Sequence, residues 1–365
     1  MMFSAADHAH MARALRLAAR GLYTASPNPR VGCVIVRDGD VVGEGWHART
    51  GEAHAEALAL AAAGARARGA TAYVSLEPCS HQGRTPPCSA ALVAAGVARV
   101  VAAMADPNPR VRGEGGAQLR AAGIAYEEGL LAAQARELNI GFVSRMERGR
   151  PWLWLKLAAS LDGRTALANG KSQWITGEAA RRDGHRFRAR ACAILTGADT
   201  VRADDPRLTV RGVEGARQPL RVVVDSRLLT PPRARILEGG AVLVATASGD
   251  AAKAAVLREA GAEVILLPGA AGRVDLAALL RLLAERGVNE LHAEAGQRLS
   301  GALLEQGLVD EFLFYFAPTL IGGGRDLFAL PPLEDLAGRR DLEITELRRV
   351  GRDIRILARP APAPV

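Results

Sequence analysis

Three short motifs in the first third of the chain supply one imidazole, two thiols and one spare carboxylate. His54 and Glu56 lie two residues apart at the start of a predicted helix. Cys79 follows a predicted strand, and Cys88 begins another predicted helix. One histidine and two cysteine thiolates can bind zinc and leave its fourth position open. Strand and helix patterns alternate around these motifs, which predicts an α/β sheet covered by helices, with the zinc ligands at the ends of its elements.

This set of side chains suits the hydrolysis of an exocyclic amine. Zinc lowers the pKa of water, so that hydroxide is available at neutral pH. Glu56 is not needed as a ligand and can carry a proton to the departing nitrogen. A His/Cys/Cys-bound zinc and a glutamate divide the work in this way in the zinc deaminases of bases and nucleosides. Two alternatives stay open: a chance grouping with the cysteines in the core, and a structural zinc that takes His81 as its fourth ligand.

The loop between the two cysteines is longer than the usual spacing of two residues. Residues 80–87 separate them, and they include His81 and Arg84. Cationic and polar side chains beside the metal would suit an anionic group such as a phosphate. A solvated loop without a ligand is the alternative.

The chain is long enough for two domains. A length of 365 residues exceeds the roughly 150 residues typical of one domain. A basic stretch ends at Pro151, which cannot continue a helix, so we predict domains at 1–149 and 150–365. In the first, we predict helices over 7–21, 54–69, 88–96, 116–123 and 130–148, and strands over 31–36, 41–47, 71–76 and 97–104. In the second, we predict strands over 152–160, 191–197, 220–226, 240–246, 262–268, 289–296 and 310–318, helices over 177–190, 251–259, 275–286 and 300–306, and a frayed tail over 359–365.

Composition indicates a globular protein of a reducing compartment. Hydrophobic residues make up 49% of the chain, which argues against global disorder. Four cysteines in so long a chain do not suggest a disulfide framework, and we expect Cys33 and Cys192 in the core. No apolar run approaches about 18 residues, so we expect no membrane span and a cytoplasmic location. A transit peptide within the first 21 residues is the alternative. The net charge of +8 reflects either an arginine-rich genome or an anionic partner.

Longer stretches of the chain resemble a known family. The runs SPNPRVGCVIV, HAE, EPCSHQGRTPPC and DPNPRVRGEG are similar to the deaminase half of the bifunctional riboflavin-biosynthesis deaminase–reductases. The runs KLAASLDGRTA, KSQWIT, ADTVRADDPRLTVR and AEAGQRLSGALL are similar to their reductase half. The resemblance covers nearly the whole chain. It implies a cytidine-deaminase-like α/β/α sandwich followed by a dihydrofolate-reductase-like α/β domain, with Zn²⁺ and NADPH as cofactors.

The resemblance also implies two steps and a set of site residues. A diaminohydroxy-pyrimidine ribosylamine phosphate would be deaminated, and its ribose would then be reduced to ribityl. Glu56 and Asp204 are the catalytic residues implied, and His54, Cys79 and Cys88 are the zinc ligands. The cofactor would lie at Ala158, Trp174, Thr200, Asp204, Ser226, Gly296, Gln297, Arg298, Leu299, Ser300, Gly301 and Ala302. The substrate would lie at Asn28, Ser172, Arg188, Leu208, Arg211 and Glu294, to which the anion-binding loop adds His81 and Arg84.

The residues of the second half, taken without the resemblance, support the same assignment, but they are a weaker signal than the zinc motifs. The glycine-flanked run Ala295–Gly301 could place a helix N-terminus against a phosphate. The family often has Glu-Gly-Gly where this chain has Glu294-Ala295-Gly296, so the backbone there approaches a ligand less freely. Arg227 follows a strand and is either a site for the 2′-phosphate of the cofactor or solvated surface. The tandem carboxylates Asp204 and Asp205 precede Pro206 in a predicted sharp turn.

Two other classes of function remain possible from sequence. One is a nucleic-acid deaminase of the tRNA-editing kind, with the second half as a binding module; the aromatic content of 4% is too low for extensive base stacking. The other is a scaffold that holds zinc without catalysis. We expect a small phosphorylated pyrimidine as the partner, no nucleic acid, no membrane, and a homo-oligomer.

Overall fold

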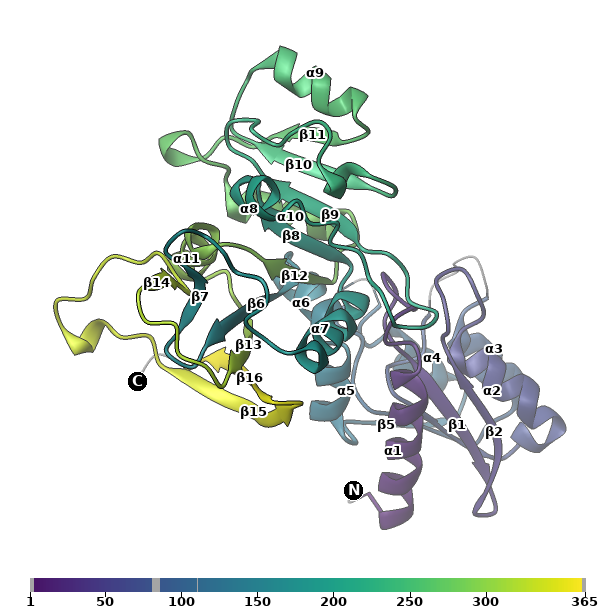
Figure 1. The fold of residues 1–365 in the computed structure, drawn as a ribbon. Helices are drawn as coiled ribbons and strands as arrows, with labels where there is room; N and C mark the ends of the chain where they lie inside the picture. Colours follow the sequence, from purple (N-terminus) through teal and green to yellow (C-terminus); the bar gives the residue numbers. More distant parts are fainter. Residues whose placement is uncertain (1–2, 81–85, 110, 363–365) are drawn as a thin grey trace. The chain divides into compact units, whose positions relative to one another are not determined.

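The computed structural model describes residues 3–80, 86–109 and 111–362 (Figure 1). The chain divides into two compact units, Met1–Gly149 and Arg150–Val365. Each unit contains its own sheet and its own hydrophobic core. All four cysteines are free thiols, and Cys33 and Cys192 are buried in the two cores as expected. In the described part of the chain, no helix has the length and apolarity needed to cross a membrane.

The first unit is a five-stranded sheet with helices on both faces. Its strand order is β2-β1-β3-β4-β5, in which β1 is antiparallel to β2 and β3, and β3, β4 and β5 are parallel. The strands are β1 (Gly32–Arg37), β2 (Asp40–Trp46), β3 (Thr71–Val74), β4 (Arg99–Ala102) and β5 (Ala125–Glu128). The helices are α1 (Ala5–Ala19), α2 (Ala55–Ala63), the 3-10 helix η1 (Gly64–Ala67), α3 (Cys88–Ala95), α4 (Glu114–Ala121), α5 (Ala132–Leu138) and α6 (Ile140–Arg148).

Alternation along β1 produces the two faces of this sheet. Cys33 and Ile35 pack into the core on the α2 side, whereas Val34 and Val36 pack into the core on the α1 side. Two glycines of β2 let α2 approach closely, because a Cβ at Gly43 or Gly45 would lie 2.2 or 2.3 Å from carbonyl oxygens of α2. The start of α2, where His54 and Glu56 lie, is thereby held against the sheet.

The second unit is a nine-stranded mixed sheet of order β11-β10-β9-β8-β12-β6-β13-β16-β15. Its strands are parallel as far as β13, and the last two pairs are antiparallel. They are β6 (Trp152–Ser160), β8 (Ala193–Gly197), β9 (Leu220–Val224), β10 (Val242–Thr246), β11 (Glu263–Leu266), β12 (Glu290–Glu294), β13 (Glu311–Ala317), β15 (Leu342–Val350) and β16 (Asp353–Pro360), with a separate pair β7 (Arg164–Leu167) and β14 (Gly324–Asp326). The helices are α7 (Glu178–Arg190), α8 (Ala198–Asp204), α9 (Ala251–Glu259), α10 (Leu276–Glu285) and α11 (Gln297–Glu305), with short 3-10 turns at Arg235–Leu237, Ala270–Gly272 and Leu336–Gly338.

The α/β character predicted for both halves is confirmed, and several local predictions are wrong. The helix predicted over 130–148 breaks at Asn139, whose φ of −107° is not helical and whose side chain bonds both backbone groups of Arg30 at 2.8 and 3.0 Å. The helix predicted over 54–69 ends at Ala63, since Gly64 has a φ of 55°. The tail is ordered as far as Pro360, in β16, rather than frayed from Arg359. The elements β5, β7, α8, β14, β15 and β16 were not predicted.

Candidate active sites

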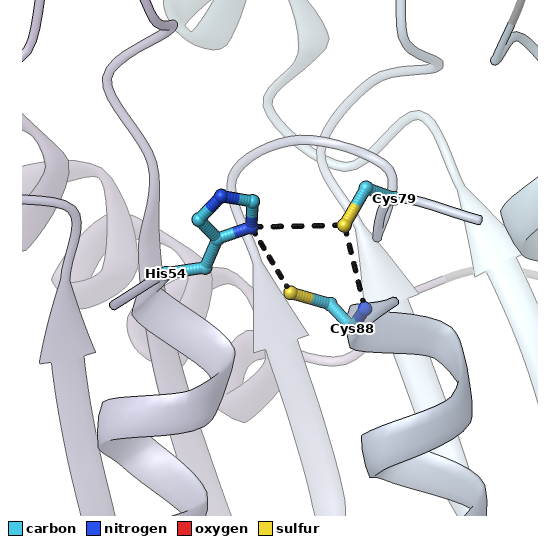
Figure 2. A group of neighbouring side chains, drawn as sticks. All are labelled: His54, Cys79 and Cys88. Carbon is cyan, nitrogen blue, oxygen red and sulfur yellow. Dashed lines mark hydrogen bonds between the residues drawn. The ribbon is translucent and has the colours of Figure 1, made fainter. Parts of the chain in front are cut away.

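In the first unit the structure brings His54, Cys79 and Cys88 together (Figure 2). Their ligand atoms all lie within 4.8 Å of one another. The Nδ1 atom of His54 lies 3.3 Å from the Cys88 sulfur and 3.6 Å from the Cys79 sulfur. His54 precedes the first residue of α2, and Cys88 is the first residue of α3, so the two helix starts and the loop after β3 meet at this point.

The spacing of these donors fits a zinc ion. Zn–N and Zn–S bonds in tetrahedral geometry separate a nitrogen from a sulfur by about 3.6 Å. The two nitrogen–sulfur distances observed are close to this value. One nitrogen and two sulfurs also form a shell with an open position, as catalytic zinc sites have.

The electrostatics around the three ligands favour a thiolate and a protonatable acid. Hydrogen bonds from the Cys88 thiol and from His54 hold the pKa of Cys79 well below its ordinary value. The Cys88 backbone amide, at a helix start, adds a further bond of 3.3 Å to the Cys79 sulfur. Burial raises the pKa of Glu56 to about 7, although its own backbone amide opposes the rise. A carboxyl group that titrates near neutrality can both accept and return a proton.

A second buried glutamate, Glu77, positions the loop that carries Cys79. Its carboxylate accepts hydrogen bonds from the backbone amides of Asp106, Gly113 and Gly116 at 3.0–3.1 Å. Three such bonds satisfy a buried carboxylate and fix the backbone around it. The motif Glu-Pro-Cys was noted in the sequence, but no supporting role was predicted for its glutamate.

Asn28 contacts the site through His47. Asn28 was predicted as a site residue, but His47 was not. The Asn28 amide nitrogen lies 3.0 Å from His47 Nε2, and His47 Nδ1 lies 3.2 Å from the Ala53 carbonyl oxygen. The rings of His47 and His54 are 5.4 Å apart. His81 and Arg84, predicted to bind the substrate, lie outside the described residues.

Replacement of one ligand should abolish metal binding. We expect Cys88→Ser to hold far less zinc than the wild-type protein, because a neutral hydroxyl replaces a thiolate in a three-ligand shell. Metal analysis after dialysis measures the zinc content. Cys33→Ser, which changes a core cysteine outside the shell, is the matched control, and full zinc occupancy in Cys88→Ser would remove Cys88 from the shell.

In the second unit a cavity of about 1820 Å³ opens beside the sheet. Single small-molecule sites usually occupy roughly 300–1,000 Å³, so this volume suits a cofactor and a substrate together. The structure brings most of the predicted reductase residues to its wall. They are Ala158, Ser172, Trp174, Arg188, Thr200, Asp204, Leu208, Arg211, Ser226, Glu294, Gly296, Gln297, Arg298, Leu299 and Ala302.

Two predicted cofactor residues do not line this cavity. Ser300 is fully buried, and its hydroxyl donates to the Ala295 carbonyl. A Cβ on Gly301 would lie 2.4 Å from the Ala329 carbonyl oxygen, so this glycine allows helix α11 to pack against that segment. The helix begins at Gln297, three residues before the predicted start at Ser300, and Gly296 is its N-cap.

Glu294, at the end of β12, carries the main buried charge of the cavity. Arg188 donates to its carboxylate at 3.0 Å, and the Lys156 ammonium lies 3.6 Å away. Burial opposes ionisation of Glu294, but the two cations outweigh it and hold its pKa well below the usual value. Lys156 was not predicted as a site residue; its only sequence signal was its place in the run KLAASLDG.

Four arginines of the cavity wall lie close to one another. Burial lowers the pKa of Arg211, and the charges of Arg188, Arg207 and Arg235 lower it further. His185 lies beside them and accepts a hydrogen bond from the Arg211 backbone amide at 3.2 Å. Like charges this close favour an anion as their shared partner. Arg235 was not predicted, because only the fold brings it close to the other arginines.

The backbone at the tandem residues Asp204 and Asp205 does not form the predicted sharp turn. Asp204 is the last residue of α8, and Asp205 ends the helix with a φ of 40°. Asp205 accepts a hydrogen bond from the Arg235 amide at 2.7 Å, whereas the Asp204 carboxylate has no hydrogen-bond partner within the described residues. Desolvation in the cavity wall raises the pKa of Asp204, and Arg325 opposes the rise.

The first unit holds a three-ligand metal site with a buried acid, and the second holds a large cavity lined by cations. Together these sites define a metal-dependent hydrolase joined to a second enzyme. The matches to family models agree with this pair of enzymes. "Cytidine and deoxycytidylate deaminase zinc-binding region" matches residues 4–104 and "RibD C-terminal domain" matches 151–356.

Relatives and solved structures match both units together. The riboflavin biosynthesis protein RibD of Escherichia coli is 50% identical over 95% of this chain and 98% of its own length. The structure of Acinetobacter baumannii RibD has a TM-score of 0.92 at 43% identity and covers 98% of this chain and 99% of its own. The deaminase/reductase of Thermotoga maritima has a TM-score of 0.87 at 32% identity, with the same coverage. The chain belongs to the RibD family of bifunctional deaminase–reductases. The predicted family and the predicted pair of domain folds are confirmed.

Proposed function

We propose that this chain catalyses two consecutive steps of riboflavin biosynthesis. The first is hydrolytic deamination of 2,5-diamino-6-(5-phosphoribosylamino)pyrimidin-4-one, and the second is NADPH-dependent reduction of the ribosyl to the ribityl side chain. We assign the first step to residues 1–149 and the second to 150–365. The observation that supports this most is that each unit holds a separate site of the required chemistry.

In the first site His54, Cys79 and Cys88 would hold zinc, and Glu56 would move the protons. Zinc bound there lowers the pKa of water and so provides a nucleophile at neutral pH. Glu56 takes a proton from the attacking water and gives it to the exocyclic nitrogen, which leaves as ammonia. Asn28, whose amide lies beside His47, would contact the pyrimidine.

In the second site the sugar must open to a C=N bond, which then gains a hydride at carbon and a proton at nitrogen. NADPH supplies the hydride. The cluster around Arg211 would bind the substrate phosphate. Glu294 fixes Arg188 within this cluster through their ion pair, and Asp204 would orient the sugar or the cofactor from the cavity wall.

We also propose a small-molecule substrate, a cytoplasmic location and a homo-oligomeric state. The cationic side chains around Arg211 line a cavity rather than an open surface, which favours a small phosphorylated ligand over a nucleic acid. Competition with tRNA tests the substrate class, since a small-molecule enzyme is not inhibited at micromolar tRNA. Sedimentation of the purified chain measures the oligomeric state.

One experiment separates the proposed steps. The purified protein is incubated with the diamino-pyrimidine substrate, with and without NADPH, and the products are identified by mass. We expect replacement of an amine by oxygen in both reactions, and addition of two hydrogens only with NADPH. Absence of ammonia release from the zinc-loaded protein would contradict the first step, and an unreduced product with NADPH would contradict the second.

Asp204→Asn should impair reduction without loss of stability. A carboxylate in the last turn of a helix opposes the helix dipole, so Asp204 does not stabilise α8. We expect an unchanged or slightly higher melting temperature, and a fall of roughly tenfold to a hundredfold in NADPH oxidation from the loss of a charged contact. Steady-state kinetics on deaminated substrate measures the effect, with Asp341→Asn, outside the cavity, as the control. An unchanged kcat and KM would exclude a role for Asp204.

A further inference from the structure

A histidine is buried next to the cavity of the second unit, and neither of the steps proposed above uses it. His292 is on β12, two residues before Glu294, and is only 1% exposed. Because side chains alternate along a strand, His292 and Glu294 are on the same face of the sheet. The Nε2 atom of His292 lies 3.3 Å from a carboxylate oxygen of Glu294. His292 can therefore act on the cavity through Glu294, but it cannot touch a ligand directly.

The ring of His292 is poorly satisfied in this position. Neither ring nitrogen has an aligned hydrogen-bond partner within the described residues. The other neighbour on the same face of β12 is Glu290, which is paired with Arg190 and accepts a hydrogen bond of 3.1 Å from the Trp154 indole. A buried polar group without a hydrogen bond destabilises the fold. Such a group in a native structure calls for an explanation, and the contact with Glu294 supplies one.

Burial keeps the His292 ring neutral. Desolvation lowers its pKa against the opposing effect of Glu294, and the charges of Arg188 and Lys156 lower it further. A neutral imidazole has one N–H and one lone pair. With the proton on Nε2, an N–H faces the Glu294 carboxylate, whereas with the proton on Nδ1 a lone pair would face it. The carboxylate therefore selects the tautomer that is protonated at Nε2.

The other two partners of Glu294 also face the ligand. Arg188 donates to both oxygens of Glu294, and the Lys156 ammonium lies 3.6 Å from one of them. Both cations line the cavity, and a substrate phosphate would draw on Arg188. A guanidinium group that is shared with a phosphate holds its carboxylate less firmly. His292 is buried away from the ligand, so it is the one of these three groups that stays with Glu294 when the site is occupied.

We propose that His292 is a positioning residue of the reductase site, whose Nε2–H donates to Glu294 and keeps this carboxylate directed at Arg188 and Lys156 while the substrate is bound. The proposal rests on the reductase activity proposed above for the identity of the substrate. It explains why a polar ring occupies a place that an apolar ring would fill with less loss of stability. His292 contributes to substrate binding through Glu294 and takes no part in hydride transfer.

Two substitutions in the full-length chain separate positioning from packing. His292→Phe keeps a ring of similar size without a donor, whereas His292→Gln keeps an N–H group near the place of Nε2. The melting temperature of His292→Phe should equal or exceed that of the wild type, because unsatisfied polar atoms are removed. Its KM for deaminated substrate should nevertheless rise roughly tenfold, the lower end of the loss for a hydrogen bond to a charged group. Its kcat and its KM for NADPH should change little, and His292→Gln should recover most of the substrate KM.

The protonation of the ring provides a measurement that does not depend on catalysis. In protein labelled with nitrogen-15 at histidine, the NMR signals that are lost in His292→Phe identify His292, and their chemical shifts report which nitrogen carries the proton. We expect a neutral ring protonated at Nε2 at neutral pH. A charged ring or a proton on Nδ1 would overturn the proposal.

The kinetic outcomes are equally decisive. An unchanged substrate KM in folded His292→Phe would overturn the proposal, and an equal rise of KM in His292→Phe and His292→Gln would overturn it in favour of packing alone. If the wild type reduced no deaminated substrate, the proposed function would fail, whereas the ring signals would still show whether His292 donates to Glu294.

Discussion

Glu56→Gln is expected to abolish deamination while zinc binding and the fold persist. The amide has nearly the same shape as the carboxyl group, but it cannot take a proton from water or return one to the leaving nitrogen. General acid–base catalysis of this kind contributes about 10²–10⁴-fold. Ammonia release should fall by that factor. Glu56 is buried, and burial raises its pKa to about 7. The neutral amide removes the cost of ionising this buried side chain, so we expect the fold of the variant to persist.

The same variant should leave the second activity intact. NADPH oxidation on substrate that has already been deaminated should match the wild type, since Glu56 belongs to the other compact unit. Glu114→Gln, an exposed glutamate in the first turn of α4, provides the matched control for ammonia release. Release near the wild-type rate in zinc-loaded Glu56→Gln would show that Glu56 is a bystander.

The grouping of His54, Cys79 and Cys88 could be predicted because each residue lies at the boundary of a strongly patterned element. A helix start and a strand end are local features, and the chemistry of zinc requires only that the donors converge. The supporting residues could not be predicted in this way. Glu77 acts on amides some thirty to forty residues away in the chain, and the contact of His47 with Asn28 depends on how two loops fold.

The second unit shows a similar limit on sequence reasoning. Its buried parallel strands were predictable from continuous apolar runs. The edge pair β15 and β16 was missed, and β15 is exposed along nearly all its length, including its large apolar residues Leu342, Ile344 and Leu347. Ser300 and Gly301 were assigned to the cofactor by family position, but helix α11 turns them into the protein. Arg235 reaches the Arg211 cluster only through tertiary structure.

Glu294→Gln is expected to destabilise the protein strongly at neutral pH. The side chain of Glu294 is 14% exposed, and that of its partner Arg188 is 16% exposed. Removing one member of a buried pair leaves the other charge uncompensated, at a cost of about 3–5 kcal/mol. Denaturant unfolding at pH 7 measures this free energy. Glu263→Gln, which breaks an ion pair with 52% and 34% exposed side chains, should cost at most about 1 kcal/mol.

The pH dependence distinguishes loss of this charge from loss of packing. The pKa of Glu294 is depressed in the folded protein by Arg188 and Lys156 against the effect of burial. Its ionised form therefore stabilises the fold at pH values above the ordinary 4.5, and this contribution is lost as the pH falls through the lower folded-state pKa. The unfolding free energies of wild type and Glu294→Gln should differ by a constant amount from pH 7 down to the ordinary 4.5, and should converge as the solution is acidified below it toward the folded-state value. A difference that stayed constant below 4.5 as well would mean that the variant disturbs packing and that the Glu294–Arg188 charge pair adds no stability of its own.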